Sequence, residues 1–216
     1  RVQFSITNPK ETHDTNINGT LNLLEICREM KVKRFVFSSS SSVYGDQDKS
    51  PLVESMNPNP ISPYAFHKLA GEHYCRLYNL LYGLETVCLR YFNVYGSKQD
   101  PTGQYAILIP KFIAKALDNE ELVINGDGKQ TRDFTFVKDV VNANILAGIS
   151  RNKEIFGKSF NIGTGNNKSV NEVTETILKL AKNNKVKIVH GPNVVEPKNT
   201  LADVSKSLKL LNWKPE

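Results

Sequence analysis

Arg34-Phe-Val-Phe-Ser-Ser-Ser-Ser-Ser42 is the stretch that decides the fold. Its first residues are mostly apolar, and they predict a short buried strand from Arg34 to Ser39. The serines from Ser38 to Ser42 then bring hydroxyl groups to the carboxyl end of that strand, where open α/β sheets bind their ligands. A serine-rich turn without any function has the same sequence, so the interpretation depends on the flanking segments.

The flanking segments alternate between helix and strand. Apolar residues recur at helical spacing from Asn16 to Met30 and again from Tyr64 to Tyr82, after which Gly83 is a natural C-terminal stop. A second strand is expected from Glu85 to Arg90. This alternation predicts an α/β fold, in which helices cover both faces of a doubly wound parallel sheet.

The second half of the chain mixes the two kinds of element more irregularly. Ser169-Val-Asn-Glu172 fits a capping box that opens a helix. We expect helices at 106–117, 138–149, 169–182 and 204–211, and strands at 122–124, 132–136, 159–162 and 186–190. These elements predict a smaller mixed α/β part beside the main sheet.

Composition and charge limit the classes of function. The 216 residues are 39% hydrophobic and 23% charged, and a chain of this length buries a core without disulfides or a metal. Cys27, Cys75 and Cys88 are far apart, which is typical of reduced cysteines in a cytoplasmic protein. No stretch resembles a membrane span or a secretory leader, and the lysines behind the net charge of +6 are scattered. We therefore expect no metal site, no membrane and no nucleic acid partner. The positive charge predicts a solvated surface first and an anionic small-molecule substrate second.

Tyr64-Ala-Phe-His-Lys68 places a phenol and an ammonium four residues apart, on one side of a helix. A nearby cation stabilises a phenolate and lowers the tyrosine pKa from its usual value of about 10. Such a pair can serve as a general base near neutral pH. Tyrosine and lysine at this spacing are more often a half-buried ring beside a solvated charge, but only Tyr64 among the eight tyrosines has a lysine at that offset.

No glycine-rich turn precedes Asn16, although a dinucleotide-binding domain opens with a strand, such a turn and a helix. Gly163-Thr-Gly165-Asn-Asn-Lys168 has a similar pattern, but its third glycine is replaced and no acidic residue ends the next strand. We consider it a poor candidate for a phosphate site. Either the chain has lost its first strands or the protein lacks that half, and residues 1–216 alone should bind a dinucleotide weakly.

Eight short motifs, taken together, resemble those of one family. They are Asn16-Ile-Asn-Gly-Thr20, Phe37-Ser-Ser-Ser-Ser-Ser-Val-Tyr-Gly45, Ser62-Pro-Tyr-Ala-Phe-His-Lys68, Leu89-Arg-Tyr-Phe-Asn-Val-Tyr-Gly96, Gly126-Asp-Gly128, Thr131-Arg-Asp-Phe134, Phe160-Asn-Ile-Gly163 and Leu201-Ala-Asp203. The chain resembles the extended short-chain dehydrogenase/reductases, specifically the NAD-dependent epimerases and dehydratases of nucleotide sugars. The resemblance implies a Rossmann-like, N-terminally incomplete dinucleotide-binding domain at 1–94 and 136–165. The substrate domain would comprise 95–135 and 166–216.

The resemblance also implies roles for individual residues. Ser40, Tyr64 and Lys68 would be catalytic, with Tyr64 as the base. The implied cofactor contacts are Thr15, Ser38, Tyr64, Lys68 and Phe92. The implied contacts to the nucleotide sugar are Ser40, Ser42, Asn93, Val123, Asn125, Arg132 and Thr200. A guanidinium matches phosphate oxygens in a fork that lysine cannot reproduce, which suits Arg132 to a diphosphate.

The implied reaction is the 4-epimerisation of a UDP-sugar, through a 4-keto intermediate and with bound NAD. Dehydratases of the family carry an Asp-Glu pair just after the catalytic residue, whereas Ser41 and Ser42 here lack the carboxyl groups for that proton transfer. The stretch from Asp100 to Pro110 also resembles the epimerase branch. The alternatives are a 4,6-dehydratase, another NAD-dependent sugar-nucleotide enzyme and a non-catalytic binding fragment, and the choice between NAD and NADP stays open.

Two positions bear on the substrate. Asn193 stands where family members commonly carry an arginine that grips the diphosphate, and Lys198 is the nearest substitute. Thr200 precedes the Ala202-Asp203 pair by two residues, where members restricted to plain hexoses carry a tyrosine. The resemblance therefore implies that UDP-glucose, UDP-galactose and their N-acetyl forms are all accepted.

The resemblance further implies a homodimer. Its interface would be a four-helix bundle formed by the helices at 16–30 and 64–82. Leu23, Tyr74 and Leu80 support this expectation, because the two helices carry more large apolar residues than one covered face requires.

Overall fold

The computed structural model describes residues 1–102, 107–183, 185–193 and 197–216 of the chain. Its main sheet consists of three parallel strands in the order β1-β2-β7, which span Arg34–Ser40, Glu85–Tyr91 and Lys158–Ile162. Ser40 lies opposite Tyr91, and Tyr91 lies opposite Ile162, so all three strands end at one edge. The predicted α/β class and parallel sheet are confirmed.

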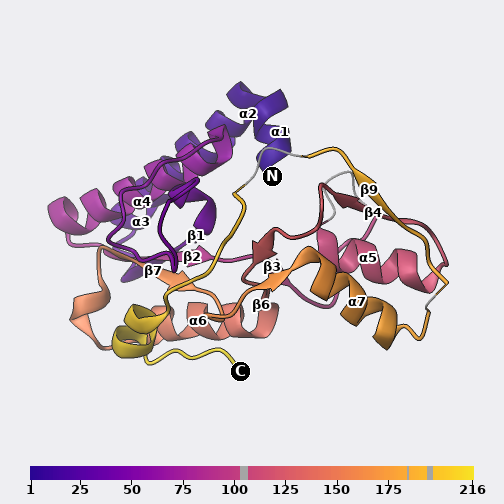
Figure 1. The fold of residues 1–216 in the computed structure, drawn as a ribbon. Coiled ribbons are helices and arrows are strands. Elements are labelled where there is room, and N and C mark those ends of the chain that lie inside the picture. The colour runs from indigo at the N-terminus through magenta and orange to yellow at the C-terminus, as the bar shows by residue number, and fades with distance from the viewer. Residues whose placement is uncertain (103–106, 184, 194–196) are drawn as a thin grey trace.

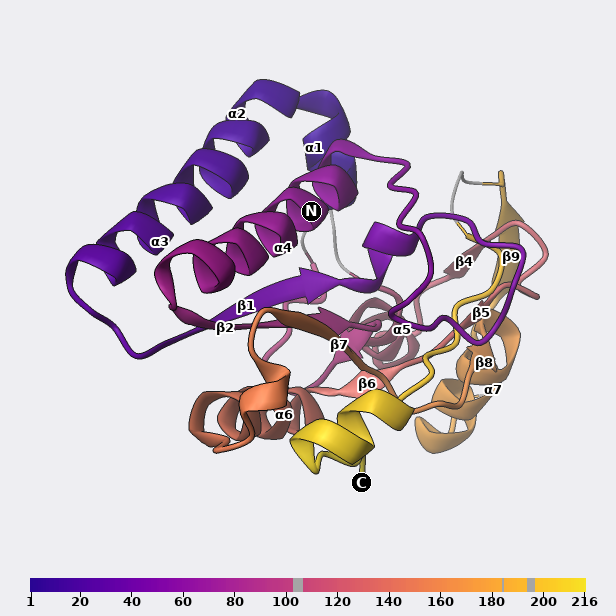
Figure 2. The ribbon, with the colours of Figure 1, turned by 90° about the vertical axis from the view of Figure 1, so that its left-hand side faces the viewer.

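Helices cover both faces of this sheet. Figure 2 shows α4 (Pro63–Tyr82) and α3 (Gly19–Glu29) above the strands and α6 (Val137–Ile149) below them. Alternate residues of a strand face opposite sides, so β1 and β2 each contribute to two apolar clusters, one on each face of the sheet. The cluster around Phe37 lies on the α4 side, and the cluster around Phe160 lies on the α6 side.

The ends of α4 follow from its sequence. The Ser62 hydroxyl accepts a hydrogen bond from the Ala65 N–H at 3.2 Å, and Pro63 occupies the first helical turn, where its missing N–H costs nothing. Gly83 ends the helix in the left-handed conformation, with φ of 70°. Because both ends are fixed, Tyr64 lies in the first turn of the helix, next to the sheet edge.

Helical structure begins well before the predicted start at Asn16. The helices α1 (Val2–Thr7) and α2 (Pro9–His13) are separated at Asn8, and a π-helical turn, η1 (Asp14–Asn18), leads into α3. Short polar side chains in this region hide the helical periodicity, since Thr7 and Thr12 bond back to main-chain carbonyls of the preceding turn.

A second unit lies beside the sheet, at the right of Figure 1. It pairs β4 (Leu122–Asn125) with β9 (Ile188–Gly191) in parallel and packs α5 (Leu108–Leu117) against α7 (Val170–Leu180). The predicted capping box is present, because Ser169 and Glu172 bond reciprocally at the start of α7. The predicted helix at 106–117 begins two residues later, and Ala106 lies outside the described residues.

The single strand expected at 132–136 is two shorter strands with different partners. β5 (Thr131–Arg132) pairs antiparallel with β8 (Lys168–Ser169), and β6 (Thr135–Phe136) pairs parallel with β3 (Val94–Tyr95). The buried Asp133 lies between them and turns its carboxylate to other main-chain groups. The segment therefore joins the two units of the fold.

The C-terminal residues return to the main sheet. After the short 3₁₀ turn η3 (Lys153–Ile155) and the second unit, a π-helical turn, η4 (Ser207–Leu211), lies close to α6 in Figure 1. Trp213 is fully buried in the α6-side cluster, and its indole N–H donates to the Asp139 carbonyl at 2.9 Å. Trp213 thus packs against the main sheet, and the division that assigns 166–216 to the substrate domain stays a prediction. Among the described residues, no helix is long and apolar enough to cross a bilayer.

Candidate active site

Ser40 ends β1 and opens the 3₁₀ turn η2 (Ser41–Tyr44). Its hydroxyl oxygen accepts a hydrogen bond from the Ser42 N–H at 3.1 Å, and its hydroxyl lies 3.1 Å from that of Ser42. Gly45 closes the turn with φ of 65°, where a Cβ atom would lie 1.8 Å from the Asn59 carbonyl oxygen. The turn therefore holds Ser40 at the carboxyl edge of the sheet, as the sequence predicts.

Tyr64 reaches the same edge from α4. Its phenol forms a hydrogen bond with Ser40, and its main-chain N–H donates to the Ser5 hydroxyl of α1 at 3.0 Å. Burial raises the pKa of Tyr64 above its usual value, and the Ser40 hydrogen bond only partly opposes that rise. The free protein thus favours the neutral phenol, which must lose its proton before Tyr64 can act as a base.

Lys68 lies one turn further along α4. Its ammonium donates to the Ser38 carbonyl at 2.8 Å and lies 5.7 Å from the centre of the Tyr64 ring. Burial lowers the pKa of Lys68. The expected lowering of the Tyr64 pKa by Lys68 is not met here, because the lysine binds the strand rather than the phenol. Ser38 also faces this edge, and its hydroxyl lies 3.1 Å from the Tyr91 phenol.

A cavity of about 420 Å³ brings together four of the implied nucleotide-sugar contacts. Asn93 follows the end of β2, and Arg132 lies in β5. Val123 and Asn125 are alternate residues of β4, so they face the same side of that strand and leave Leu122 and Ile124 to the core. The size is in the range of small-molecule sites, and Asn93 places one wall beside the strand end that carries Ser40.

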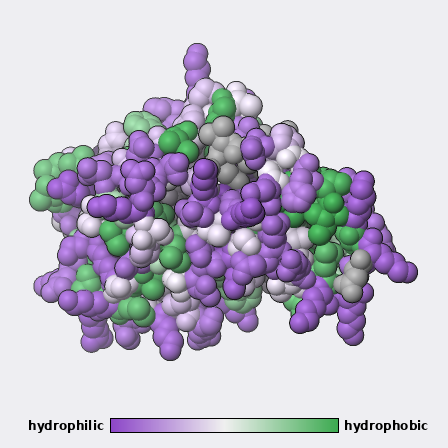
Figure 3. Space-filling model, in the orientation of Figure 1, coloured by the Kyte–Doolittle hydropathy of each residue, from purple (hydrophilic) through white to green (hydrophobic). Residues whose placement is uncertain are grey.

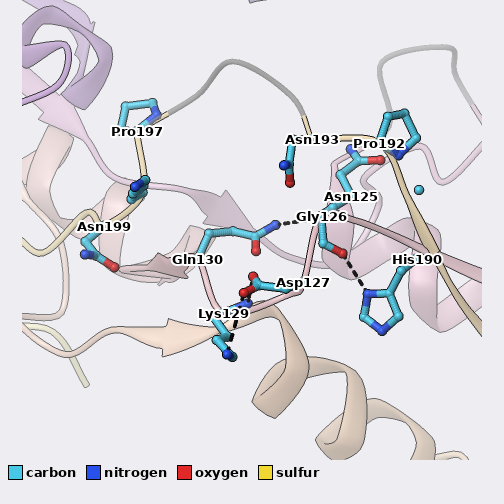
Figure 4. A pocket seen from close by; sticks show the side chains of 12 residues that line it. Asn125, Gly126, Asp127, Lys129, Gln130, His190, Pro192, Asn193, Pro197 and Asn199 are labelled. Atoms are coloured by element: carbon cyan, nitrogen blue, oxygen red, sulfur yellow. Dashed lines mark hydrogen bonds and ion pairs between the residues drawn. The ribbon is translucent and has the colours of Figure 1, made fainter.

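A larger open hollow of about 1110 Å³ adjoins this cavity and shares Asn125 and Gln130 with it. Figure 4 shows Asn193 pointing toward Gly126 from the opposite strand segment. Gly126 has φ of 68°, and a Cβ atom there would lie 2.4 Å from the Asn193 amide oxygen. Lys198 also lines the hollow, as does Lys129, which pairs with Asp127 at 3.8 Å. Residues 194–196, between Asn193 and Lys198, lie outside the described residues.

Arg132 and Thr200 are buried where β5 meets the segment that follows this hollow. The Arg132 guanidinium donates to the Thr131 carbonyl at 2.8 Å and to the Lys198 carbonyl at 3.3 Å. The Thr200 N–H donates to the Thr131 carbonyl at 3.1 Å. Thr200 is 9% exposed, and its hydroxyl has no hydrogen-bond partner among the described residues.

The side chains of two implied cofactor residues, Thr15 and Phe92, do not contact Tyr64 or Lys68 in the described part of the chain. Thr15 is exposed on η1. The Phe92 ring is fully buried in a cluster with Val43 and Tyr44, and its N–H donates to the Ile162 carbonyl. A ligand contact by Phe92 would therefore have to come from its main chain.

The turn at Gly163-Thr-Gly165 is bound by a protein carboxylate. Asp133 is fully buried and accepts hydrogen bonds from the Thr164 N–H at 2.7 Å and the Gly165 N–H at 3.0 Å. It also accepts from the Ala202 N–H at 3.2 Å. Main-chain N–H groups that already bind a carboxylate cannot bind a phosphate at the same time. This turn is therefore a poor phosphate site.

Sequence reasoning missed a buried charged network behind Ser40. Glu72 on α4 pairs with Arg90 on β2 at 2.7 Å, and Ser39 and Ser159 bond to the same carboxylate. The available signal was Arg90 itself, because a charged residue inside an apolar strand indicates a buried partner. Among the described residues, no group of three or more metal-ligating side chains is found.

Comparisons with known proteins show the family of the chain. The model of the NAD dependent epimerase/dehydratase family matches residues 1–163. A putative UDP-glucose 4-epimerase of Methanocaldococcus jannaschii is 42% identical over the whole chain, which covers 68% of that protein.

Solved structures are similar as well. The UDP-N-acetylglucosamine 4-epimerase of Methanobrevibacter ruminantium, in complex with UDP-N-acetylmuramic acid, is 37% identical with a TM-score of 0.95. The UDP-glucose 4-epimerase of Thermotoga maritima, with UDP-glucose, is 37% identical with a TM-score of 0.94. The chain is covered completely in both comparisons and spans 68% and 69% of those chains.

Proposed function

We propose a function on the premise that this chain belongs to the NAD dependent epimerase/dehydratase family. The proposal is that it forms the catalytic part of a UDP-sugar 4-epimerase. The observation that carries it is the pair of Tyr64 and Ser40 at the carboxyl edge of a parallel sheet, together with a cavity of about 420 Å³ that Asn93 lines just after the end of β2. Lys68 completes the set of candidate catalytic residues from the same helix.

Tyr64 is the proposed base. Its oxygen takes the proton of the sugar 4-hydroxyl and later returns it to the 4-oxygen, so one group serves both directions. Ser40 bonds to the phenol and favours the charged form, since the hydrogen bond lowers the Tyr64 pKa. Lys68 holds the end of β1 through the Ser38 carbonyl and keeps a positive charge near the phenol.

The residues at this edge fit the ribose end of NAD. A lysine ammonium has three N–H donors, and Lys68 uses one of them on Ser38 in the described structure. The other two can serve ribose hydroxyls, while Tyr64, Ser38, Thr15 and the main chain of Phe92 are the further proposed contacts. When bound, NAD supplies reversible uptake of a hydride from the sugar carbon.

The UDP group is proposed to occupy the two adjoining hollows. Val123 and Asn125 offer an apolar surface and an amide to the base, and Asn93 offers an amide near the sugar. Arg132 offers a planar fork of donors for the diphosphate, and the adjacent Lys198 adds positive charge. The charge of these groups suits an anionic substrate.

A dehydratase is disfavoured by the turn after Ser40. Ser41 and Ser42 form the start of η2, and neither hydroxyl can exchange a proton as a carboxyl group does. Epimerisation requires no acid beyond Tyr64, so the described site suffices for it. Thr200 leaves more room than a tyrosine would, which supports acceptance of N-acetylated UDP-hexosamines as well as plain hexoses.

A homodimer is proposed through α3 and α4. Leu23 and Ile26 on α3 are 54% and 53% exposed, and Leu80 on α4 is 70% exposed. Figure 3 shows the corresponding apolar patch at the left, over the ends of these helices. Tyr74 contributes less than its sequence position suggests, because its ring packs partly against the core.

The test is conversion of UDP-glucose to UDP-galactose by the full-length protein with added NAD, followed by chromatography of the nucleotide sugars. Interconversion that stops in Tyr64→Phe supports the proposal. Release of a 4-keto-6-deoxy sugar would instead identify a dehydratase, and tight UDP-sugar binding with no product would identify a binding protein.

A further inference from the structure

The Glu72 carboxylate joins α4 to every strand of the main sheet. Its Oε1 atom accepts hydrogen bonds from the Ser39 hydroxyl at 2.5 Å and from Arg90 Nε at 2.9 Å. Its Oε2 atom accepts from Arg90 Nη2 at 2.7 Å and from the Ser159 hydroxyl at 2.9 Å. These donors come from β1, β2 and β7, so the four acceptor positions of the carboxylate are all used.

This ion pair is buried and charged. Glu72 is 6% exposed and Arg90 is 4% exposed. Burial would lower the pKa of Arg90, but the hydrogen bonds and charge of Glu72 outweigh it and raise that pKa. Buried pairs add little net stability compared with apolar packing, and their best-attested use is to fix one register between elements.

The pair lies on the helix face that carries the candidate catalytic residues. Glu72 follows Lys68 by four residues and Tyr64 by eight, so the three share one side of α4. The strand residues they contact are consecutive in β1, since Tyr64 bonds to Ser40, Lys68 to the Ser38 carbonyl and Glu72 to Ser39. A shift of α4 along β1 would break all three contacts at once.

We propose that Glu72, through its hydrogen bond with Ser39, is a positioning residue that sets the register of α4 on β1 and thereby holds the Tyr64 phenol against Ser40. Arg90 holds the carboxylate through two hydrogen bonds and keeps it directed toward Ser39. The inference rests on the proposed function, because positioning matters for turnover only if Tyr64 transfers the proton.

Ser159 offers a matched control. The Ser39 and Ser159 hydroxyls each give one hydrogen bond to the same carboxylate, but Ser159 lies in β7, and that strand carries none of the proposed catalytic residues. Ser39→Ala and Ser159→Ala therefore each remove one hydrogen bond to Glu72, a buried bond of 2.5 Å and a part-buried bond of 2.9 Å. Only the first loosens the contact beside Ser40.

The experiment compares these variants in the full-length protein with NAD and UDP-glucose. Both should lower the melting temperature, since each removes a hydrogen bond to Glu72. Ser39→Ala should reduce kcat about tenfold with KM changed by less than about twofold, because small displacements of a reacting group cost rate rather than binding. Ser159→Ala should keep the wild-type kcat. Equal kcat values in the two variants overturn the proposal.

A second readout does not depend on turnover. Tyrosine labelled with ¹³C at Cζ gives an NMR titration of each phenol, and the signal missing from Tyr64→Phe identifies Tyr64. Since the Ser40 contact lowers the Tyr64 pKa, loosening it in Ser39→Ala should move that titration to higher pH. A Tyr64 titration that is the same in Ser39→Ala and in Ser159→Ala contradicts the inference, even if the wild type shows no epimerase activity. Inactivity of the wild type would count against the proposed function alone.

Glu72→Gln tests the carboxylate itself. It strands a buried guanidinium and can unfold the chain, so it is combined with Arg90→Met, which removes the unpaired charge. The double variant should regain melting temperature relative to Glu72→Gln and still show the low kcat. Recovery of both the melting temperature and kcat would mean that the pair serves stability only.

Discussion

The Lys68 ammonium donates its hydrogen bond to the Ser38 carbonyl at 2.8 Å, while the Tyr64 ring centre on the same helix face lies 5.7 Å away. The lysine thus secures the strand that ends in Ser40 and acts on the phenol only through space. Burial raises the pKa of Tyr64 and lowers that of Lys68, because it disfavours the charged form of each group. This arrangement governs the first two predictions.

Tyr64→Phe should lower kcat by about 100- to 10,000-fold, the usual contribution of a positioned acid or base. The ring stays in place, so loss of the hydrogen bond to Ser40 should cost only about 1 kcal/mol of stability. Tyr78→Phe is the matched control, because it removes another tyrosine hydroxyl of α4 that bonds to Glu25 instead. Steady-state kinetics and thermal melting measure both. Near-normal turnover by Tyr64→Phe would exclude it as the base.

The pH profile of kcat/KM should rise through the alkaline range. The free protein holds the Tyr64 proton because burial raises its pKa, and the active phenolate therefore accumulates only as the pH increases. Ser40→Ala removes the contact that lowers this pKa, so the rising limb should move to still higher pH. The usual tyrosine pKa is about 10, so a profile that stays flat between about pH 7 and pH 10 would rule out Tyr64 as the titrating group.

Arg132→Lys should raise KM for UDP-sugars by about tenfold and leave kcat nearly unchanged. Lysine keeps the charge but not the planar fork that matches phosphate oxygens, so ground-state and transition-state binding weaken together. Arg151→Lys, on an exposed arginine outside both hollows, is the control and should change neither constant. A fall in kcat with an unchanged KM would place Arg132 in the chemistry instead of in binding.

Assembly through α3 and α4 is tested at Leu80, which is 70% exposed. Leu80→Asp buries a charge if that surface is an interface, so sedimentation should show a dimer in the wild type and monomers in the variant. Leu180→Asp changes an equally exposed leucine on α7, at 77%, and should leave the dimer intact. A wild-type monomer contradicts the proposed interface.

Local patterns predicted the elements that place the site. The helical spacing from Tyr64 and the stop at Gly83 predicted the bounds of α4 to within one residue, and the capping box at Ser169 predicted the start of α7. These signals lie within one or two turns of the chain. They were sufficient to predict the strands of the main sheet, the bounds of α4 and the order of helices and strands along the second unit.

Long-range pairing was beyond such patterns. Glu72 meets Ser39, Arg90 and Ser159, which are 33, 18 and 87 residues away, and no local spacing connects them. The expected strand at 132–136 divides for the same reason, because its two ends pair with different distant strands. The return of Trp213 to the main core likewise depends on packing between segments that are far apart in sequence.

Thr200 carries the prediction on substrate range. Its side chain is buried in the segment that β5 holds through the Thr131 carbonyl, and its hydroxyl has no partner among the described residues. In the resembled epimerases this position faces the sugar 2-substituent, and a tyrosine there fills the space of an acetamido group. The wild type should therefore turn over both UDP-N-acetylglucosamine and UDP-glucose.

Thr200→Tyr should abolish turnover of the acetylated sugar and retain that of UDP-glucose, because the ring occupies only the space of the 2-substituent. Thr200→Val is the control: it keeps the volume, removes a buried hydroxyl whose unmade bond costs about 1–3 kcal/mol, and should keep both activities at equal or higher stability. The ratio of kcat/KM for the two sugars is the measurement, with melting temperatures to separate overpacking from selectivity. A wild type that rejects UDP-N-acetylglucosamine, or a tyrosine variant that accepts both sugars in the wild-type ratio, would remove Thr200 from the substrate pocket.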